Sequence, residues 1–189
     1  AASDVYKRQE YSPATKQSVF NHNVRLENPR FVMTSDTLRY NTLNKIAVIL
    51  GPSDIVSDNN HIYSERGNYN TVTGQAELLD RSVLTNQGKR LVGDSLFYDR
   101  RLGYGEAFDK VEMTDVVNKN MLTGDYCYYN ELTDSALATK RAVAIDFSQG
   151  DSLFMHGDTL QMVTFHMNTD SLYRLMKVFH KVRIFRTDV

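Results

Sequence analysis

The chain has 189 residues, of which 41% are hydrophobic, and its formal net charge is −1, so it has enough apolar side chains for a buried core. The nearly balanced charge argues against a nucleic-acid partner, because nucleic-acid-binding surfaces are strongly basic. The longest apolar run, residues 46–50, is far shorter than the roughly 20 residues of a membrane-spanning helix. The single cysteine, Cys127, excludes an internal disulfide bond.

The first residues differ from the rest of the chain. Residues 1–9 contain no apolar segment of the kind an export signal needs, and they do not match the pattern that follows. We therefore expect a non-native or disordered leader over residues 1–9 and one domain over residues 10–189. Neither end resembles the atypical terminal unit of a repeat protein, so we interpret the chain as a fragment of a longer protein.

A tyrosine followed by a small polar residue recurs along the chain from residue 11 onward. The interval is 29 residues three times and then 31 residues, at Tyr11, Tyr40, Tyr69, Tyr98 and Tyr129. A fixed period of this length is the signature of tandem structural units. The many Tyr, Phe, Val, Ile and Thr residues favour strands. We predict an elongated, all-β protein built from repeats of about 30 residues rather than a compact enzyme.

Each repeat has the same internal order. A small residue and an acid precede the tyrosine by five and four positions, at Ser35-Asp36, Ser64-Glu65, Gly93-Asp94 and Gly124-Asp125, and Gly157-Asp158 precedes Met162 in the same way. Alternating apolar positions such as Leu96 and Tyr98 predict several short strands per repeat, joined by Asn, Asp and Gly turns. We interpret the acids as turn formers. Residues 172–178 fit a short helix or a strand, and we favour a strand because residues 181–184 resemble residues 110–113.

Strand alternation places Leu38 and Tyr40 on one face and Arg39 on the other. The next strand of each repeat supplies small residues to that face, at Ala47, Ala76, Ala107, Ala136 and Ala138. Large residues beside small ones suit either a filled core or a groove for an apolar ligand, and the pattern does not separate the two. The candidate lining residues are Leu38, Tyr40, Ile49, Tyr69, Leu78, Leu96, Tyr98, Ala107, Val111, Met113, Tyr129 and Leu160.

Catalytic and metal motifs are weak in this sequence. The segment 156–158, His-Gly-Asp, coincides with a repeat position, the histidines lack metal-type spacing, and no glycine-rich phosphate loop occurs. The repeated acids lack the dense Gly-Asp nonapeptides of calcium-binding β-rolls. Cys127 occupies a position held elsewhere by leucine, which predicts a small buried hydrophobe.

We expect no catalytic residue, no metal and no cofactor. A β-solenoid polysaccharide lyase or hydrolase, and a structural scaffold with a filled interior, remain alternatives.

Segments 35–41 (SDTLRYN) and 93–99 (GDSLFYD) resemble the OstA-like proteins of lipopolysaccharide export, over about residues 11–189. The shared pattern is small-Asp-x-Leu-x-Tyr followed by Asn or Asp, with a glycine and an alanine in the next strand. The sequence departs from it at Gly67, where other repeats have Leu or Cys, and over residues 161–175, where the spacing is lost.

The resemblance implies an antiparallel β-jellyroll, or half-open β-taco. It places the protein in the periplasm of a Gram-negative envelope, and it is also compatible with an association with the outer membrane. It implies an apolar trough that holds the acyl chains of lipopolysaccharide during transport to the outer membrane. It also implies end-to-end strand pairing with other jellyroll components of an export bridge.

Overall fold

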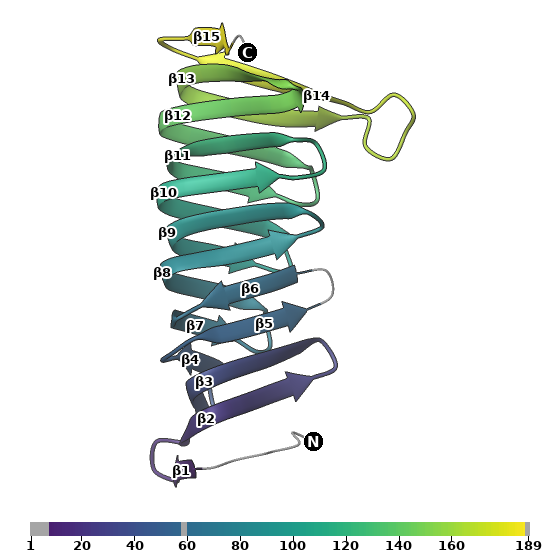
Figure 1. Cartoon of the computed structure of the whole chain (residues 1–189). Helices are drawn as coiled ribbons and strands as arrows, with labels where there is room; N and C mark the ends of the chain where they lie inside the picture. Colours follow the sequence, from purple (N-terminus) through teal and green to yellow (C-terminus); the bar gives the residue numbers. More distant parts are fainter. Residues whose placement is uncertain (1–7, 58–59, 188–189) are drawn as a thin grey trace. The chain divides into compact units, whose positions relative to one another are not determined.

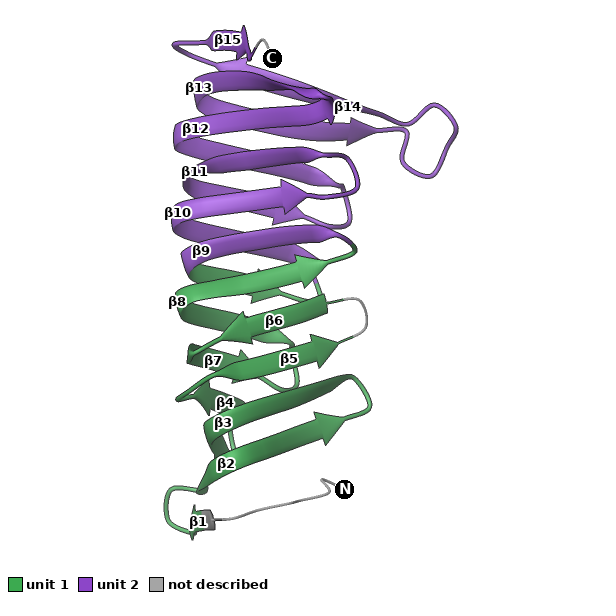
Figure 2. Cartoon of the chain, in the orientation of Figure 1, with its two compact units in different colours: residues 1–87, 95–101 green, residues 88–94, 102–189 purple. Residues whose placement is uncertain are grey.

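The computed structural model describes residues 8–57 and 60–187. These residues form fifteen strands, their pairings are antiparallel, and no helix occurs among them, which confirms the all-β prediction (Figure 1). The chain divides into two compact units, residues 1–87 with 95–101 and residues 88–94 with 102–189 (Figure 2), which we call unit 1 and unit 2. Of the expected leader, residues 1–7 lie outside the described part, and residues 8 and 9 begin the first strand.

The strands of unit 1 are β1 (Arg8–Ser12), β2 (Gln17–Asn28), β3 (Phe31–Asn41), β4 (Ile46–Ile49), β5 (Ser53–Ser57), β6 (Asn60–Ser64), β7 (Arg66–Asn70) and β8 (Gln75–Asn86). Strand β9 (Lys89–Asp99) contributes residues to both units. Those of unit 2 are β10 (Tyr104–Asp115), β11 (Asn120–Asn130), β12 (Ser135–Gln149), β13 (Asp151–Phe165), β14 (Tyr173–Phe179) and β15 (Arg183–Arg186). The preference for a strand over residues 172–178 is therefore confirmed.

The prediction of several short strands per repeat is wrong for most of the chain, because most repeats consist of two long strands that bend. The pairing register shifts at the bends, for example between Thr139 and Ala142 of β12. Such a bulge redirects a strand, and each long strand thereby passes into a second layer facing the first (Figure 1). The bends of β2, β8, β10 and β12 each contain two consecutive residues with positive φ, which are His22-Asn23, Asp80-Arg81, Asp109-Lys110 and Lys140-Arg141. His180-Lys181, between β14 and β15, form another such pair.

Each unit therefore has two layers. We call the layer that holds the tyrosine positions of the repeat the tyrosine layer and the other the opposite layer. In unit 1 the strands are interrupted rather than bent between residues 46 and 70, so that β4 and β7 pair in the tyrosine layer while β5 and β6 pair in the opposite layer. The interruption between β4 and β5 contains Pro52, which has no N–H to donate to a strand ladder.

The small-acid pairs of the repeat lie at these bends and not in turns, so our interpretation of the acids as turn formers is wrong. The small residue is required because the neighbouring strand passes close by: a Cβ on Gly124 would lie 2.8 Å from the Thr139 carbonyl oxygen. In unit 1 the equivalent serines are buried, and Ser53 donates to the Ser35 hydroxyl at 2.7 Å. Three of the acids pair with a positive-φ cationic residue later in the chain: Asp94 with Lys110 at 3.0 Å, Asp125 with Arg141, and Asp158 with Lys181 at 3.5 Å.

The Asn and Asp residues after the tyrosines do form the turns, as predicted. The side-chain oxygen of Asn70 accepts hydrogen bonds from the backbone N–H groups of Val72 and Thr73, both at 3.0 Å, and Asn130 does the same with residues 132 and 133. Successive turns are joined as well, because the Thr71 N–H donates to the Lys45 carbonyl at 3.0 Å. The turns thus extend the backbone hydrogen bonding of the strands.

The core of each unit lies between its two layers. In unit 1 the Phe31 ring of the opposite layer meets the Tyr69 ring of the tyrosine layer edge to face, with centroids 5.1 Å apart. Tyr69 pairs across the strands with Ala76, and in unit 2 Tyr129 pairs with Ala136, which confirms the predicted combination of large and small residues. Burial of these apolar surfaces drives the two layers together.

Candidate functional site

The predicted lining residues lie on the inward face of both units. Eleven of the twelve are buried, with at most 8% of their surface exposed, and Tyr40 is half-buried. Leu38, Tyr40, Ile49, Tyr69, Leu78, Leu96 and Tyr98 belong to unit 1, and Ala107, Val111, Met113, Tyr129 and Leu160 belong to unit 2. Their burial agrees with the predicted inward orientation, and binding of a lipid by these residues stays a prediction.

At these positions the interior is filled by its own side chains. Leu160 and Ala107 are fully buried, and Tyr69 is 1% exposed against Phe31. Gly67, which departs from the leucine of other repeats, is part of this close packing. A Cβ there would lie 2.3 Å from the Glu77 carbonyl oxygen and 2.9 Å from the Leu78 Cα. The glycine therefore lets β7 and β8 approach each other.

Unit 2 has an opening into its interior, a cavity of about 160 Å³ between the two layers. Five of the seven methionines of the chain line it, from the strands β10, β11, β13 and β14. Its walls consist of Met113, Met121, Leu122, Ala144, Ile145, Met155, Met162 and Met176, with the polar Asn120, Asp146 and Arg174 also lining it. Methionine side chains are unbranched and adapt to irregular shapes. This wall is therefore suited to changing its shape around a ligand.

Of the residues that line this cavity, only Met113 was among the lining residues predicted from the sequence. The available signal was the concentration of methionines after residue 112, with Met162 in a position that other repeats give to tyrosine. The region 161–175, where the repeat spacing is lost, still forms paired strands: Met162 on β13 lies opposite Met176 on β14. A loop over residues 166–172 separates the two strands and accounts for the irregular spacing (Figure 1).

A buried polar cluster adjoins the cavity through Arg174. Asp134 lies at its centre and is 4% exposed. Lys89 donates to one carboxylate oxygen of Asp134 and, at 2.6 Å, to the Tyr129 hydroxyl. Arg174 donates to the other oxygen from Nε at 3.0 Å and from Nη2 at 2.8 Å, and Thr164 donates to it at 2.9 Å.

The cluster holds Asp134 in its charged form. Burial alone would raise the pKa of this carboxyl group, but hydrogen bonds from Lys89 and Arg174 lower it to about 2. The pKa of the neighbouring Tyr129 is raised, first by burial and then by the charge of Asp134. A buried aspartate paired with two cations is thus a fixed structural charge beside the apolar cavity, rather than a group that exchanges protons near neutral pH.

The positions considered for catalysis are used structurally. The His156 ring stacks on Phe185 of β15 with centroids 5.4 Å apart. Cys127 is fully buried, as predicted, and burial raises the pKa of its thiol to about 12. Among the described residues, no group of three or more His, Cys, Asp or Glu side chains could hold a metal ion. The described residues also include no helix long and apolar enough to cross a membrane.

Two layers of bent antiparallel strands around an apolar interior define a repeat-built β-jellyroll module. The chain belongs to the OstA-like protein family, whose model matches residues 5–36 and 57–146, more than half of the sequence. No curated protein matches the sequence.

Among solved structures, the chain is similar to LptH from Pseudomonas aeruginosa, described as the LptA-homologous periplasmic component of the conserved lipopolysaccharide transport device. The two are 8% identical, the match covers 92% of each chain, and the TM-score is 0.31.

Proposed function

We propose that this protein takes part in lipopolysaccharide transport by holding acyl chains in the interior of its jellyroll. The observation that carries the proposal is the methionine-lined cavity of unit 2, a mainly apolar opening whose wall includes Met113, one of the predicted lining residues. Membership of the OstA-like family supports the same conclusion. The proposed location is the periplasm, where a lipid moving between two membranes needs cover from water.

The size of the cavity defines how binding would occur. At about 160 Å³ it is smaller than the roughly 300–1,000 Å³ of typical ligand pockets. An acyl chain would therefore displace methionine side chains and separate the two layers. Each buried CH₂ group contributes about 0.8 kcal/mol, so a few methylenes offset the rearrangement of flexible side chains. Holding the lipid needs no catalytic group, and we propose that the protein is not an enzyme.

Further jellyroll components are the proposed protein partners, and the strands β14 and β15 are the proposed place of contact. Each pairs with β13 along one edge, and no described strand pairs with its other edge. Their exposed apolar side chains include Leu175, Phe179, Ile184 and Phe185, of which Ile184 is 61% exposed. An unpaired edge with apolar side chains is suited to pairing with a further strand.

Photo-crosslinking tests the lipid proposal with two neighbouring positions of one strand. Met176 lines the cavity, whereas Leu175 on the same strand is 41% exposed and points to the other face. A photoreactive amino acid at position 176 should capture lipopolysaccharide, and the same residue at position 175 should not. Equal capture from both positions, or capture from neither, would refute the proposal.

The filled interior around Tyr69 favours the scaffold alternative for unit 1. Photo-crosslinking at Leu38 and Arg39 of this unit distinguishes lipid binding from that alternative. Capture at Leu38 but not at Arg39 means that the layers open to admit lipid. Capture at position 176 alone means that unit 1 is a filled structural core and unit 2 binds. For the enzyme alternative, hydrolysis or lyase activity on envelope glycans that is abolished by His156→Ala would decide in its favour.

A further inference from the structure

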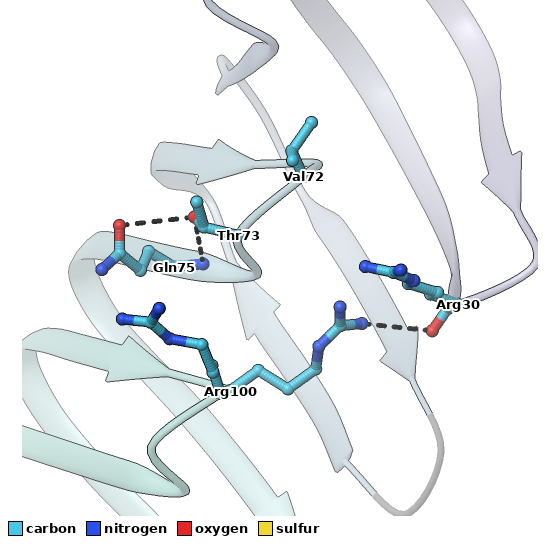
Figure 3. Close-up of a pocket in the computed structure, with 6 residues that line it drawn as sticks. Arg30, Val72, Thr73, Gln75 and Arg100 are labelled. Carbon is cyan, nitrogen blue, oxygen red and sulfur yellow. Dashed lines mark hydrogen bonds between the residues drawn. The ribbon is translucent and has the colours of Figure 1, made fainter.

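Unit 1 has a second pocket of different character, with a volume of about 650 Å³. Three arginines line it, Arg30, Arg100 and Arg101, together with Val72, Thr73 and Gln75 (Figure 3). Arg30 lies in the turn between β2 and β3, which belongs to the opposite layer. Val72 and Thr73 lie between β7 and β8, Gln75 begins β8, and Arg100 follows β9. The pocket is therefore found where turns of both layers of unit 1 meet, at the margin of the interior.

The three arginines bring positive charge to this pocket without matching acids. Among the described residues, no carboxylate lies within 4 Å of their guanidinium groups, whereas Arg66 in the same unit pairs with Asp80 at 2.9 Å. Asp99, next to Arg100 in the chain, is buried, and its carboxylate accepts hydrogen bonds from the Gln75 side chain at 2.8 Å and the Arg101 backbone at 2.9 Å. The guanidinium groups thus keep donors that an anion can use.

The position of Arg100 is determined by the turn beneath it. Gly74 has a φ of +76°, and a Cβ at this residue would lie 2.8 Å from the Arg100 Nε atom. The Arg100 side chain therefore lies directly on the glycine, and its backbone N–H donates to the Gly74 carbonyl at 3.4 Å. From there the guanidinium reaches the Arg30 carbonyl, at 3.4 Å from Nη1 (Figure 3). A longer residue at position 74 would displace this arginine.

The basic pocket is next to the apolar interior of unit 1. Arg30 precedes Phe31, which is 3% exposed and packs against Tyr69. Burial raises the pKa of the Tyr69 hydroxyl, and the charge of Arg100 acts in the opposite direction, so the guanidinium is close enough to interact with this interior side chain. An amphiphile could place an anionic head against the arginines, and its acyl chains would then have to separate the two layers of unit 1, because Phe31 and Tyr69 fill the interior there.

We propose that Arg30, Arg100 and Arg101 form a binding site for phosphate groups, and that in the cell these belong to the head of a phosphorylated glycolipid whose acyl chains enter the jellyroll. The guanidinium fork donates two parallel hydrogen bonds to a phosphate, which makes arginine better suited to this task than lysine. The lipid part of this inference rests on the proposed function, whereas the phosphate part stands on the arginine cluster alone.

The test compares the wild-type chain with a triple variant, R30Q/R100Q/R101Q, and with Arg25→Gln as a matched control. Arg25 belongs to the same unit and already pairs with Glu27 at 2.7 Å. Affinity is measured by titration calorimetry for bisphosphorylated lipid A and for the same lipid after removal of both phosphates. We expect the wild type and Arg25→Gln to prefer the phosphorylated lipid by about tenfold or more, and the triple variant to lose that preference. The preference should also weaken as salt is raised.

Inorganic phosphate, followed by ³¹P NMR line broadening, separates the two sources of the ligand. If it binds the wild type as tightly as the phosphorylated lipid does, and the triple variant loses both, the site recognises free phosphate. If no lipid binds but phosphate binding is still lost in the triple variant, the proposed function fails and the phosphate site stands. If the triple variant keeps the affinity of the wild type for every phosphorylated probe, the site is refuted.

Discussion

Arg174 donates two hydrogen bonds to one carboxylate oxygen of Asp134, although the two residues are 40 positions apart in the chain. Asp134 lies in the turn before β12 and Arg174 at the start of β14, with the whole of β13 between them in sequence. Because Arg174 also lines the methionine-lined cavity, this ion pair connects the cavity wall on β14 with the turn before β12. Lys89 completes the cluster and makes Asp134 the acceptor for two cations.

Replacing Asp134 with asparagine should destabilise the protein by about 3 kcal/mol, because it leaves two partly buried cations without a counter-charge. Urea unfolding followed by circular dichroism measures the loss. The matched control is Asp125→Asn, which removes a surface pair with Arg141, whose side chain is 81% exposed. The control should leave the unfolding midpoint nearly unchanged, because solvent screens that pair. Similar losses in both variants would contradict the importance of burial.

The contribution of Asp134 should depend on pH. Its pKa is lowered from 3.8 to about 2 in the folded protein, so the stabilisation is fully present above about pH 4 and is lost as the pH falls through about 2. The difference in unfolding free energy between the wild type and Asp134→Asn should therefore shrink by roughly 2 kcal/mol between pH 5 and pH 2. An uncharged change such as Gly67→Ala provides the reference series, whose difference should stay constant with pH.

Gly67→Ala should itself destabilise the protein by roughly 1–3 kcal/mol, because the added methyl group collides with the backbone of β8. Thermal unfolding measures the effect. Gly51→Ala is the control within the same unit, since a Cβ there would meet no atom closer than 3.5 Å. We expect little change from it. If Gly67→Ala matched the wild type, the close approach of β7 and β8 would not be a requirement of the fold.

The bend in β12 can be tested at Lys140, where φ is +58°. A β-branched side chain is strained in this conformation, so Lys140→Val should be less stable than Lys140→Gly by about 1–2 kcal/mol. At Lys177, within the regular strand β14, the order should reverse, because valine favours extended backbone and glycine does not. The same order at both positions would mean that the bend places no special demand on the backbone.

The thiol of Cys127 should be unreactive in the folded protein. Because it is fully buried and its pKa is raised to about 12, almost no thiolate is present at pH 8. Modification by a thiol-specific chromogenic reagent should be slow until urea unfolds the chain. A cysteine at Val117, which is 73% exposed, in a Cys127→Ala background should react at once. Rapid reaction of Cys127 under native conditions would show that the interior opens frequently.

The parts of the fold that depend on short-range pattern were predictable. Tyr69 and Ala76 could be placed on one face because side chains alternate along a strand, and Asn70 could be assigned to a turn because its side chain accepts hydrogen bonds from nearby backbone groups. The bends were missed. Lys140 and Arg141 are ordinary residues in a regular-looking strand, and their positive φ values arise from the packing of two layers.

The amino-acid sequence alone determined the repeat, the strand class, the inward face and the family, because each of these follows from residues close together in the chain. Only the tertiary structure decided how charges and cavities are assembled. Arg174 meets Asp134 across 40 residues, five methionines from four strands line one cavity, and Arg30 reaches the same pocket as Arg100 from 70 residues away. Such contacts depend on strand register and on where each strand bends. Register and bend positions are decided when the two layers pack together, and the repeat pattern in the sequence does not reveal them.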